Sequence, residues 1–413
     1  MAATLLTNIP VFPVPIFAGN LPDLRFSGIN TITGMPFILA HTFAGSTTVN
    51  VLNETIFPDA DGNATIKIRS VVESLLLHNY PSSPFFNQVN AITTLTLTYD
   101  TTTIFIRVIK GGLLIPESSF ESYDYQAFLL DNLLSWMPSE RKVKYRETNF
   151  LNYYVTPGQT GAQPYMKVYY FDESGMPLYQ EQAMYGPIPV GNLYSMDVSF
   201  NQLITRVYPA KSNIFAFEVS IKRNGNTISN TQRLVLDNQF DEFDDVFAFS
   251  NSIGGFETIR FNGKFTELEN HESQVFLNTN SHAIEFETIP LREITKNTGY
   301  FEADDYRKWV REFFTSSLRY FMRFGELVFI PERIAISSVR AESVKSQPNA
   351  FEFTFKIANQ VPWQLNTREI LNPINVGMAD RAPVVGDLSF DNFNEDFSNQ
   401  SGTFSFTDEV FGV

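Results

Sequence analysis

The residue types that most often carry chemistry are scarce in this sequence. It contains four histidines and no cysteine, the histidines being His41, His78, His271 and His282. The H-E-x-x-H zinc motif does not occur, and no two histidines lie four residues apart. Without cysteine, disulfides, thiol nucleophiles, zinc–thiolate sites and iron–sulfur clusters are excluded. We therefore expect all four histidines to be structural.

Motifs for nucleophilic catalysis and for phosphate binding are also missing. Neither the G-x-S-x-G nucleophile elbow nor the P-loop pattern occurs. Gly158-Gln159-Thr160-Gly161 lacks the strand and helix that a dinucleotide-binding loop needs, and Gly254-Gly255 lies between two predicted strands. We predict no catalytic residue, no cofactor, no cofactor-binding residue and no metal ligand, and we expect the protein not to be an enzyme.

Carboxylates are the remaining candidates for a site. The densest acidic cluster consists of Asp237, Asp241, Glu242, Asp244 and Asp245. Oxygen ligands of this kind bind calcium, but the cluster also suits a solvated linker between two β units, which we favour. A second acidic segment, from Asp59 to Asn63, resembles the opening of a calcium loop. An EF-hand would need Glu at the position of Ser70, so we expect a hairpin turn there.

Charge and hydropathy exclude two further classes of protein. The 413 residues include 45 acids and 30 bases, which gives a formal net charge of −15. Nucleic-acid binding requires a basic surface, so we expect none. No run approaches the roughly 20 apolar residues of a membrane-spanning helix. The N-terminus lacks the basic region of a signal peptide, and we expect synthesis in the cytoplasm.

Alternation of apolar and polar residues predicts a mainly β protein, built from tandem β-sandwich-like domains with a few short helices. The Asn224-Gly225 pair predicts a tight hairpin turn, because type I′ turns need positive φ. The clearest predicted strands are 35–44, 47–53, 92–99, 102–109, 165–171, 193–200, 214–222, 232–237, 246–250, 256–262, 274–278, 283–288, 327–331 and 351–358.

Three helices are expected. Ser70 and Glu73 have the spacing of a capping box. Asp124 is expected to cap a second helix that continues to Trp136. The third is an amphipathic helix over about 302–322, whose apolar face includes Trp309.

These patterns divide the chain into five parts. An extended N-terminal arm, 1–34, is rich in proline, although a poorly ordered leader is the alternative. The other four parts are a β-rich domain with two short helices at 35–148, a β-sandwich-like domain at 149–239, a β domain with one helix at 240–362, and a C-terminal tail at 363–413.

The C-terminal tail is acidic and punctuated by phenylalanine. Residues 365–413 hold eight acids and two arginines. Six phenylalanines are too many for a plain solvating tail, so we expect the tail either to dock on a neighbouring subunit or to fold back on its own domain. The residues predicted to form interfaces are Pro10, Pro13, Pro15, Phe390, Phe393, Phe397, Phe404 and Phe406.

Two segments of the third domain resemble a known class. Val246–Gly263 contains the turn Asn-Ser-x-Gly-Gly-Phe-Glu-Thr, and Asn297–Phe301 leads into Trp309 and Phe313. With Asp61–Ile68, they resemble virion proteins from the tail modules of phages and prophages of Bacteroidota-type hosts. The resemblance implies a distal-tail or baseplate-like structural protein, located in the virion tail. The shared motifs shape the fold, so the resemblance implies no functional residue.

The resemblance and the composition lead to the same functional expectation. We expect a virion structural protein of a phage tail, baseplate or tail tip that acts by self-assembly and protein–protein contacts. The expected partners are further copies in a ring-like homo-oligomer, other tail or baseplate proteins, and a host-surface glycan as a further candidate. The alternative is a carbohydrate-binding or adhesive β-sandwich protein.

Overall fold

The structure is a computed structural model and describes residues 3–10, 12–207, 213–239, 242–277, 283–301, 304–324, 329–342 and 350–357. Side chains are described for these residues outside 269–292, 304, 323–330 and 342. The chain forms two compact units: residues 1–268 with 293–358, and residues 269–292 with 359–413. In the second unit, the described backbone is that of 269–277 and 283–292, which belongs to two long strands.

The described residues are mainly β, as the alternation predicts. The N-terminal strands are β1 (Thr4–Leu5), β2 (Pro15–Phe17), β3 (Leu24–Ser27), β4 (Met35–Phe43), β5 (Val49–Ile56), β6 (Ala64–Ile66), β7 (Phe85–Asn87), β8 (Ile92–Tyr99) and β9 (Thr102–Ile109). The helices among and after them are η1 (Ala18–Asn20), α1 (Arg69–Leu75), η2 (Val89–Ala91), η3 (Glu117–Ser119) and α2 (Tyr125–Asp131).

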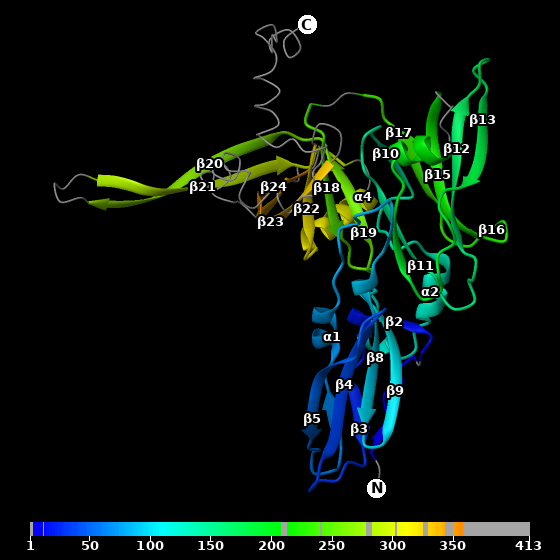
Figure 1. Cartoon of the computed structure of the whole chain (residues 1–413), viewed down its shortest axis with the longest axis vertical. Coiled ribbons are helices and arrows are strands. Elements are labelled where there is room, and N and C mark those ends of the chain that lie inside the picture. The colour runs from blue at the N-terminus through cyan, green and yellow to red at the C-terminus, as the bar shows by residue number, and fades with distance from the viewer. Residues whose placement is uncertain are drawn as a thin grey trace, which may run out of the picture. The chain divides into compact units, whose positions relative to one another are not determined.

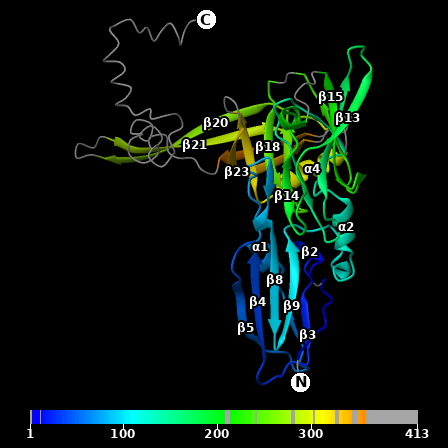
Figure 2. The same ribbon diagram turned by 45° about the vertical axis from the view of Figure 1, so that its right-hand side comes forward.

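The first sheet has the order β2-β9-β8-β4-β5, and β1, β3 and β6 form a small second one. Strands β5, β4, β8 and β9 lie side by side in both views (Figures 1 and 2). The predicted arm, 1–34, contributes β1, β2 and β3 to these sheets. Its Ile16, Phe17 and Leu21 are fully buried in the same core as β4 and β8.

The middle of the chain forms a six-stranded sheet with the order β10-β17-β15-β12-β13, in which β16 also pairs with β15. Two strands that precede the predicted domain boundary at residue 148, β10 and β7, pair with strands that follow it. β10 pairs in parallel with β17, and β7 joins the three-stranded sheet β11-β14-β7. The elements are β10 (Glu140–Val143), β11 (Phe150–Tyr154), β12 (Gln163–Phe171), β13 (Pro177–Ala183), β14 (Leu193–Asp197), α3 (Phe200–Gln202), the π-helix η4 (Leu203–Val207), β15 (Ile214–Arg223), β16 (Asn226–Thr227) and β17 (Gln232–Leu236).

The third part forms a seven-stranded sheet with the order β19-β18-β22-β23-β24-β21-β20. Helix α4 buries Trp309, Val310 and Phe313 in a core that the third part shares with the six-stranded sheet. The elements are β18 (Asp245–Ser250), β19 (Phe256–Phe261), β20 (Phe265–Leu277), β21 (Ala283–Asn297), α4 (Asp304–Thr315), β22 (Arg319–Phe324), β23 (Phe329–Glu342) and β24 (Ala350–Ile357).

The hairpin predicted at Asn224-Gly225 is confirmed, because β15 and β16 pair on either side of it. The hairpin predicted at Asp59–Asn63 is wrong: the segment is a turn, but β5 pairs with β4 and β6 with β3, in two different sheets. Asn224 and Gly225 have φ values of 50° and 82°, as a type I′ turn requires. At the Asp59–Asn63 segment, the Asp59 carboxylate accepts the backbone N–H groups of Asp61 and Asn63, at 3.0 and 2.9 Å. The carboxylate therefore closes a local turn that leads the chain from one sheet to the other.

The predicted helices exist, but their ends differ. Asp124 caps α2 through the N–H of Ala127 at 2.9 Å, as expected. However, α2 ends at Asp131, because the backbone N–H of Leu133 bonds to Asn230 and that of Leu134 to the carbonyl of Asn152. The capping box at Ser70 was a wrong prediction: α1 already begins at Arg69 and has no side-chain cap.

The amphipathic helix is shorter than its apolar pattern indicates, because residues 319–322 of the predicted range belong to β22. The Arg319 side chain donates hydrogen bonds to the carbonyls of Phe313 and Phe314, which satisfies carbonyls at the helix end. Tyr320 and Phe321 then pair with β18. Their aromatic side chains suit a strand as well as a helix face.

Candidate functional site

The segment Asn251–Thr258, called here the junction turn, comprises the turn after β18 and the first three residues of β19. Its ends are tied by reciprocal bonds: the N–H of Gly255 donates to the Asn251 side chain at 2.6 Å, and the N–H of Asn251 donates to the carbonyl of Gly255 at 2.9 Å. Inside the turn, Gly254 has a φ of 84°, which favours glycine.

One side of the junction turn contacts the N-terminal part of the chain. The N–H of Gly112 donates to the carbonyl of Ser252 at 2.7 Å, and His78 Nε2 lies 2.8 Å from the carbonyl of Gly254. A Cβ on Gly254 would lie 2.0 Å from the carbonyl oxygen of Lys110. Glycine is therefore required for the two backbones to approach this closely.

The other side contacts the segment that leads into the six-stranded sheet. The Asn251 side chain donates to the carbonyl of Leu134 at 3.0 Å, and Asn152 donates to the carbonyl of Phe256 at 2.7 Å. A Cβ on Gly255 would lie 1.9 Å from the carbonyl oxygen of Leu134. The junction turn thus joins three parts of the chain that are far apart in sequence.

Glu257 is the fully buried centre of these contacts. Its carboxylate accepts hydrogen bonds from the backbone N–H of Trp136 at 2.7 Å, from the Asn251 side chain at 2.8 Å and from Trp309 Nε1 at 2.5 Å. Burial raises the pKa of the Glu257 carboxyl, and these donors oppose the shift by stabilising its charged form. A carboxylate with this many donors is suited to holding α4 and the Trp136 segment in place.

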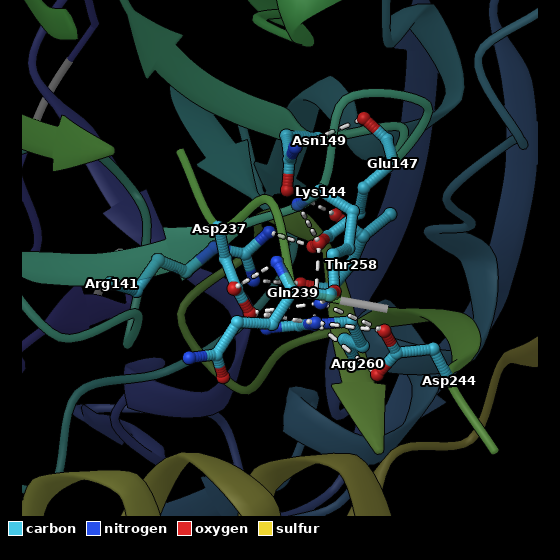
Figure 3. Close-up of polar contacts among 9 residues, drawn as sticks. All are labelled: Arg141, Lys144, Glu147, Asn149, Asp237, Gln239, Asp244, Thr258 and Arg260. Carbon is cyan, nitrogen blue, oxygen red and sulfur yellow. Dashed lines mark hydrogen bonds and ion pairs between the residues drawn. The ribbon is translucent and has the colours of Figure 1, made fainter. Parts of the chain in front are cut away.

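A network of charges, of which Arg141 and Glu147 are buried and the others half-buried, continues from Thr258 (Figure 3). Arg141 donates to the carbonyl of Thr258 at 2.8 Å and pairs with Glu147 at 2.5 Å. Arg260 pairs with Asp244 at 3.0 Å. Lys144 lies 3.0 Å from Asp237. The six charged residues, called here the ionic network, are three bases and three acids, so its formal charge is zero.

The ionic network accounts for much of the predicted acidic cluster. Asp237 and Asp244 bind Lys144 and Arg260, and Asp245 pairs with Lys296. Asp241 lies outside the described residues. Within the described part of the chain, no group of three or more histidine, aspartate or glutamate side chains is arranged to hold a metal ion. Cations of the protein itself therefore pair with three of the five candidate carboxylates, Asp237, Asp244 and Asp245.

His78 forms a pair with Ser250 that resembles the start of a catalytic arrangement. The Ser250 hydroxyl lies 2.7 Å from His78 Nδ1, and both residues are buried. Burial lowers the pKa of His78 to about 3. So weak a base is poorly matched to proton abstraction at neutral pH, and the carbonyl of Gly254 occupies its other nitrogen. The pair is therefore suited to holding the junction turn.

The other three histidines lie elsewhere. His41 is buried in the first sheet, while the His271 and His282 side chains lie outside the described residues.

The residues predicted to form interfaces have varied surroundings. Pro13 is exposed, Pro10 is half-buried and Pro15 is buried in β2. The five predicted phenylalanines from Phe390 to Phe406 lie outside the described residues. None of the described helices is long and apolar enough to cross a membrane.

The junction turn has a distinctive sequence pattern, but the pattern does not indicate what the turn contacts. Its partners, such as Leu134 and Lys110, are identified by the folded backbone alone. One feature of the sequence does indicate such contacts. Glu257 lies within the predicted strand 256–262 beside Phe256, and an acid that is buried there needs hydrogen-bond donors.

Comparison with known proteins adds little to this geometry. No protein-family model matches the sequence, and no curated protein matches it either. Among solved structures, a chain from the virion of a native gene transfer agent particle is 10% identical, with a TM-score of 0.21, and the match covers 30% of this chain and 95% of that one. A chain from the C6-symmetric tail of an empty gene transfer agent particle is 13% identical, with a TM-score of 0.23, and covers 30% and 96%. Similarities this weak carry no argument about fold or function.

Proposed function

We propose that this protein is a virion structural protein of a phage tail, baseplate or tail tip, and that it acts by self-assembly and protein–protein contacts. Its partners would be other copies in a ring-like homo-oligomer and other tail or baseplate proteins. On this proposal it is made in the host cytoplasm, is not an enzyme and works in the virion tail.

The observation that supports this proposal best is the edge strand β13. In the described part of its sheet, β13 pairs only with β12, so its other edge is open. Leu178 and Tyr179 point to opposite faces of the strand and are 44% and 65% exposed. Met176, just before the strand, is 62% exposed.

Open edge strands pair readily with other chains, and soluble proteins usually protect them with charges or by covering them. The only charged residue of β13 is Glu181, which pairs with Lys222 at 2.6 Å. An open edge that exposes Leu178 and Tyr179 is therefore suited to contact with another protein chain.

The test is the molar mass of the purified full chain, measured by light scattering after size-exclusion chromatography. We expect a closed oligomer, and Leu178→Lys should shift it toward monomer. The matched control is Ile32→Lys, which places the same charge at a residue that is 84% exposed in a turn. A wild-type protein that stays monomeric at high concentration would contradict self-assembly.

The predicted interface residues form a second test. Removing residues 365–413 should leave the melting transition cooperative but reduce the oligomer, if Phe390–Phe406 bind a neighbour. Loss of the cooperative melt would assign the tail to a core. Replacing Pro13 with lysine tests the N-terminal contact in the same assay.

A further inference from the structure

A pocket of about 470 Å³ lies next to the ionic network. This volume falls within the range of roughly 300–1,000 Å³ that is typical of small-molecule sites. One part of its lining is aromatic, with Tyr300, Phe301, Tyr306 and Trp309. The rest is polar and includes Lys142, Gln239, Asn262 and Thr298. A ligand for this pocket should have both an apolar face and several hydroxyl groups.

Tyr300 is an exposed aromatic residue on a tightly held loop. Its side chain is 63% exposed. On its N-terminal side, Thr298 exchanges two hydrogen bonds with Phe351, at 2.8 and 2.9 Å, and the N–H of Gly299 donates to the Asn297 side chain at 2.8 Å. On its C-terminal side, Phe301 stacks on Tyr306, with ring centroids 5.9 Å apart. Hydrogen bonds and ring stacking thus hold the backbone on both sides of Tyr300, while the Tyr300 ring itself stays exposed to solvent.

The charges around the pocket favour an anionic ligand. The pocket lining has three cations, Arg141, Lys142 and Arg260, and two acids, Asp237 and Glu140. Glu140 pairs with Arg233 at 3.2 Å, outside the lining, and Lys142 is the exposed cation of the set. Arg141 is 3% exposed and also lines the pocket, and its Nε–H has no acceptor among the described residues. Buried donors normally have acceptors. The pocket lining therefore has an excess of one positive charge, and one of its buried residues has an N–H donor without an acceptor among the described residues.

We propose that this pocket binds a carboxylated pyranose, a sugar ring that carries an acid group. The apolar face of the ring would lie on Tyr300, since aromatic rings offer a flat apolar surface with little side-chain entropy to lose. The carboxylate would be held by Lys142, and the hydroxyls would bond to Gln239 and Asn262. This binding does not depend on the proposed tail function, because it can be measured on any oligomeric form.

The experiment titrates the full-length protein with methyl β-D-glucuronide and with methyl β-D-glucoside, which lacks the carboxylate, and follows binding by ligand-observed NMR. We expect the glucuronide to bind and the glucoside to bind more weakly. Tyr300→Ala and Lys142→Gln should each weaken glucuronide binding by about tenfold, or about 1.4 kcal/mol. The matched controls are Tyr145→Ala and Lys67→Gln, an exposed tyrosine and an exposed lysine that do not line the pocket.

Four results would overturn the proposal. The first is no glucuronide binding at millimolar concentration. The second is equal binding of both glycosides that Lys142→Gln leaves unchanged, which would remove the role of the carboxylate. The third is displacement of the glucuronide by an equal concentration of acetate, which would remove the role of the sugar ring. The fourth is equal weakening by the control variants, which would place the binding elsewhere.

Discussion

Trp309 donates its indole N–H to the carboxylate of Glu257 at 2.5 Å, inside the core that α4 shares with the neighbouring sheets. Both side chains are almost fully buried. Hydrogen bonds to a charged group contribute about 1.5–3 kcal/mol each. This bond connects the helix to the junction turn, together with the N–H of Ser252, which donates to the Glu312 side chain of α4 at 2.9 Å.

The Glu257–Trp309 bond can be measured with a double-mutant cycle. Trp309→Phe removes the donor and keeps an aromatic ring, while Glu257→Leu removes the acceptor. We expect a coupling free energy of about 1.5–3 kcal/mol from urea denaturation, because the two residues are in direct contact. Additive effects of the two substitutions would mean that the bond contributes nothing to stability.

Gly255→Ala should be among the most destabilising small substitutions in the described chain. The added Cβ would lie 1.9 Å from the carbonyl oxygen of Leu134, which is backbone and cannot rotate away. We expect a loss of about 3 kcal/mol or more in the free energy of unfolding. Gly186→Ala is the matched control, because no atom lies within 4 Å of its added Cβ. Similar melting temperatures for the two variants would contradict the close packing described here.

The buried Arg141–Glu147 pair should be sensitive to loss of one partner. Glu147→Gln leaves Arg141 buried without its counter-ion, and we expect a loss of about 3–5 kcal/mol. Glu117→Gln is the control, because Glu117 pairs with Arg69 at the surface, where its side chain is 75% exposed. Thermal melts of both variants test this contrast, and we expect no measurable change for Glu117→Gln.

His78 should make the protein less stable in acid. Its pKa is lowered from 6.5 to about 3 by burial, so between these pH values the unfolded chain binds a proton that the folded chain does not. Stability is present above pH 6.5 and is lost as the pH falls toward 3, by up to about 4–5 kcal/mol. His78→Gln should flatten this part of the profile of unfolding free energy against pH. An unchanged slope would contradict the prediction.

Asp197 should act in the opposite direction. Burial raises its pKa from 3.8 to about 6, so its contribution is largest below pH 3.8 and is lost as the pH rises through 6. Asp197→Asn keeps a carbonyl oxygen that can accept the N–H of Ser199, now bonded at 2.9 Å. Because the residue is partly exposed, we expect a gain of about 1 kcal/mol at pH 7 and none at pH 4, measured by urea denaturation.

The sequence predicts what depends on local periodicity. Strands β8 and β9 match their predicted ranges, and Asp124 caps α2 as expected, because alternation and capping involve neighbouring residues. It does not predict where an element ends when the reason lies far away in the chain. The end of α2 depends on Asn230 and Asn152, and that of the amphipathic helix on pairing of Tyr320 and Phe321 with β18.

The same limit applies to the charged residues. Asp237 and Asp244 look like a solvated or metal-binding cluster in sequence, because Lys144 and Arg260 are distant from them along the chain. Pairing across such separations follows from sheet topology, and alternation alone does not specify topology. The fold class was therefore predictable, whereas the ionic network and the contacts of the junction turn were not.

His78 and Gly254 are in contact but lie 176 residues apart in the sequence. During synthesis on the ribosome, this contact cannot form until Gly254 has been translated. At about 5–20 residues per second, roughly 9–35 s separate the emergence of its two ends. During that interval the N-terminal sheets lack the segment that satisfies His78 and the N–H of Gly112. Nascent chains should therefore expose this surface to chaperones until the junction turn has been translated.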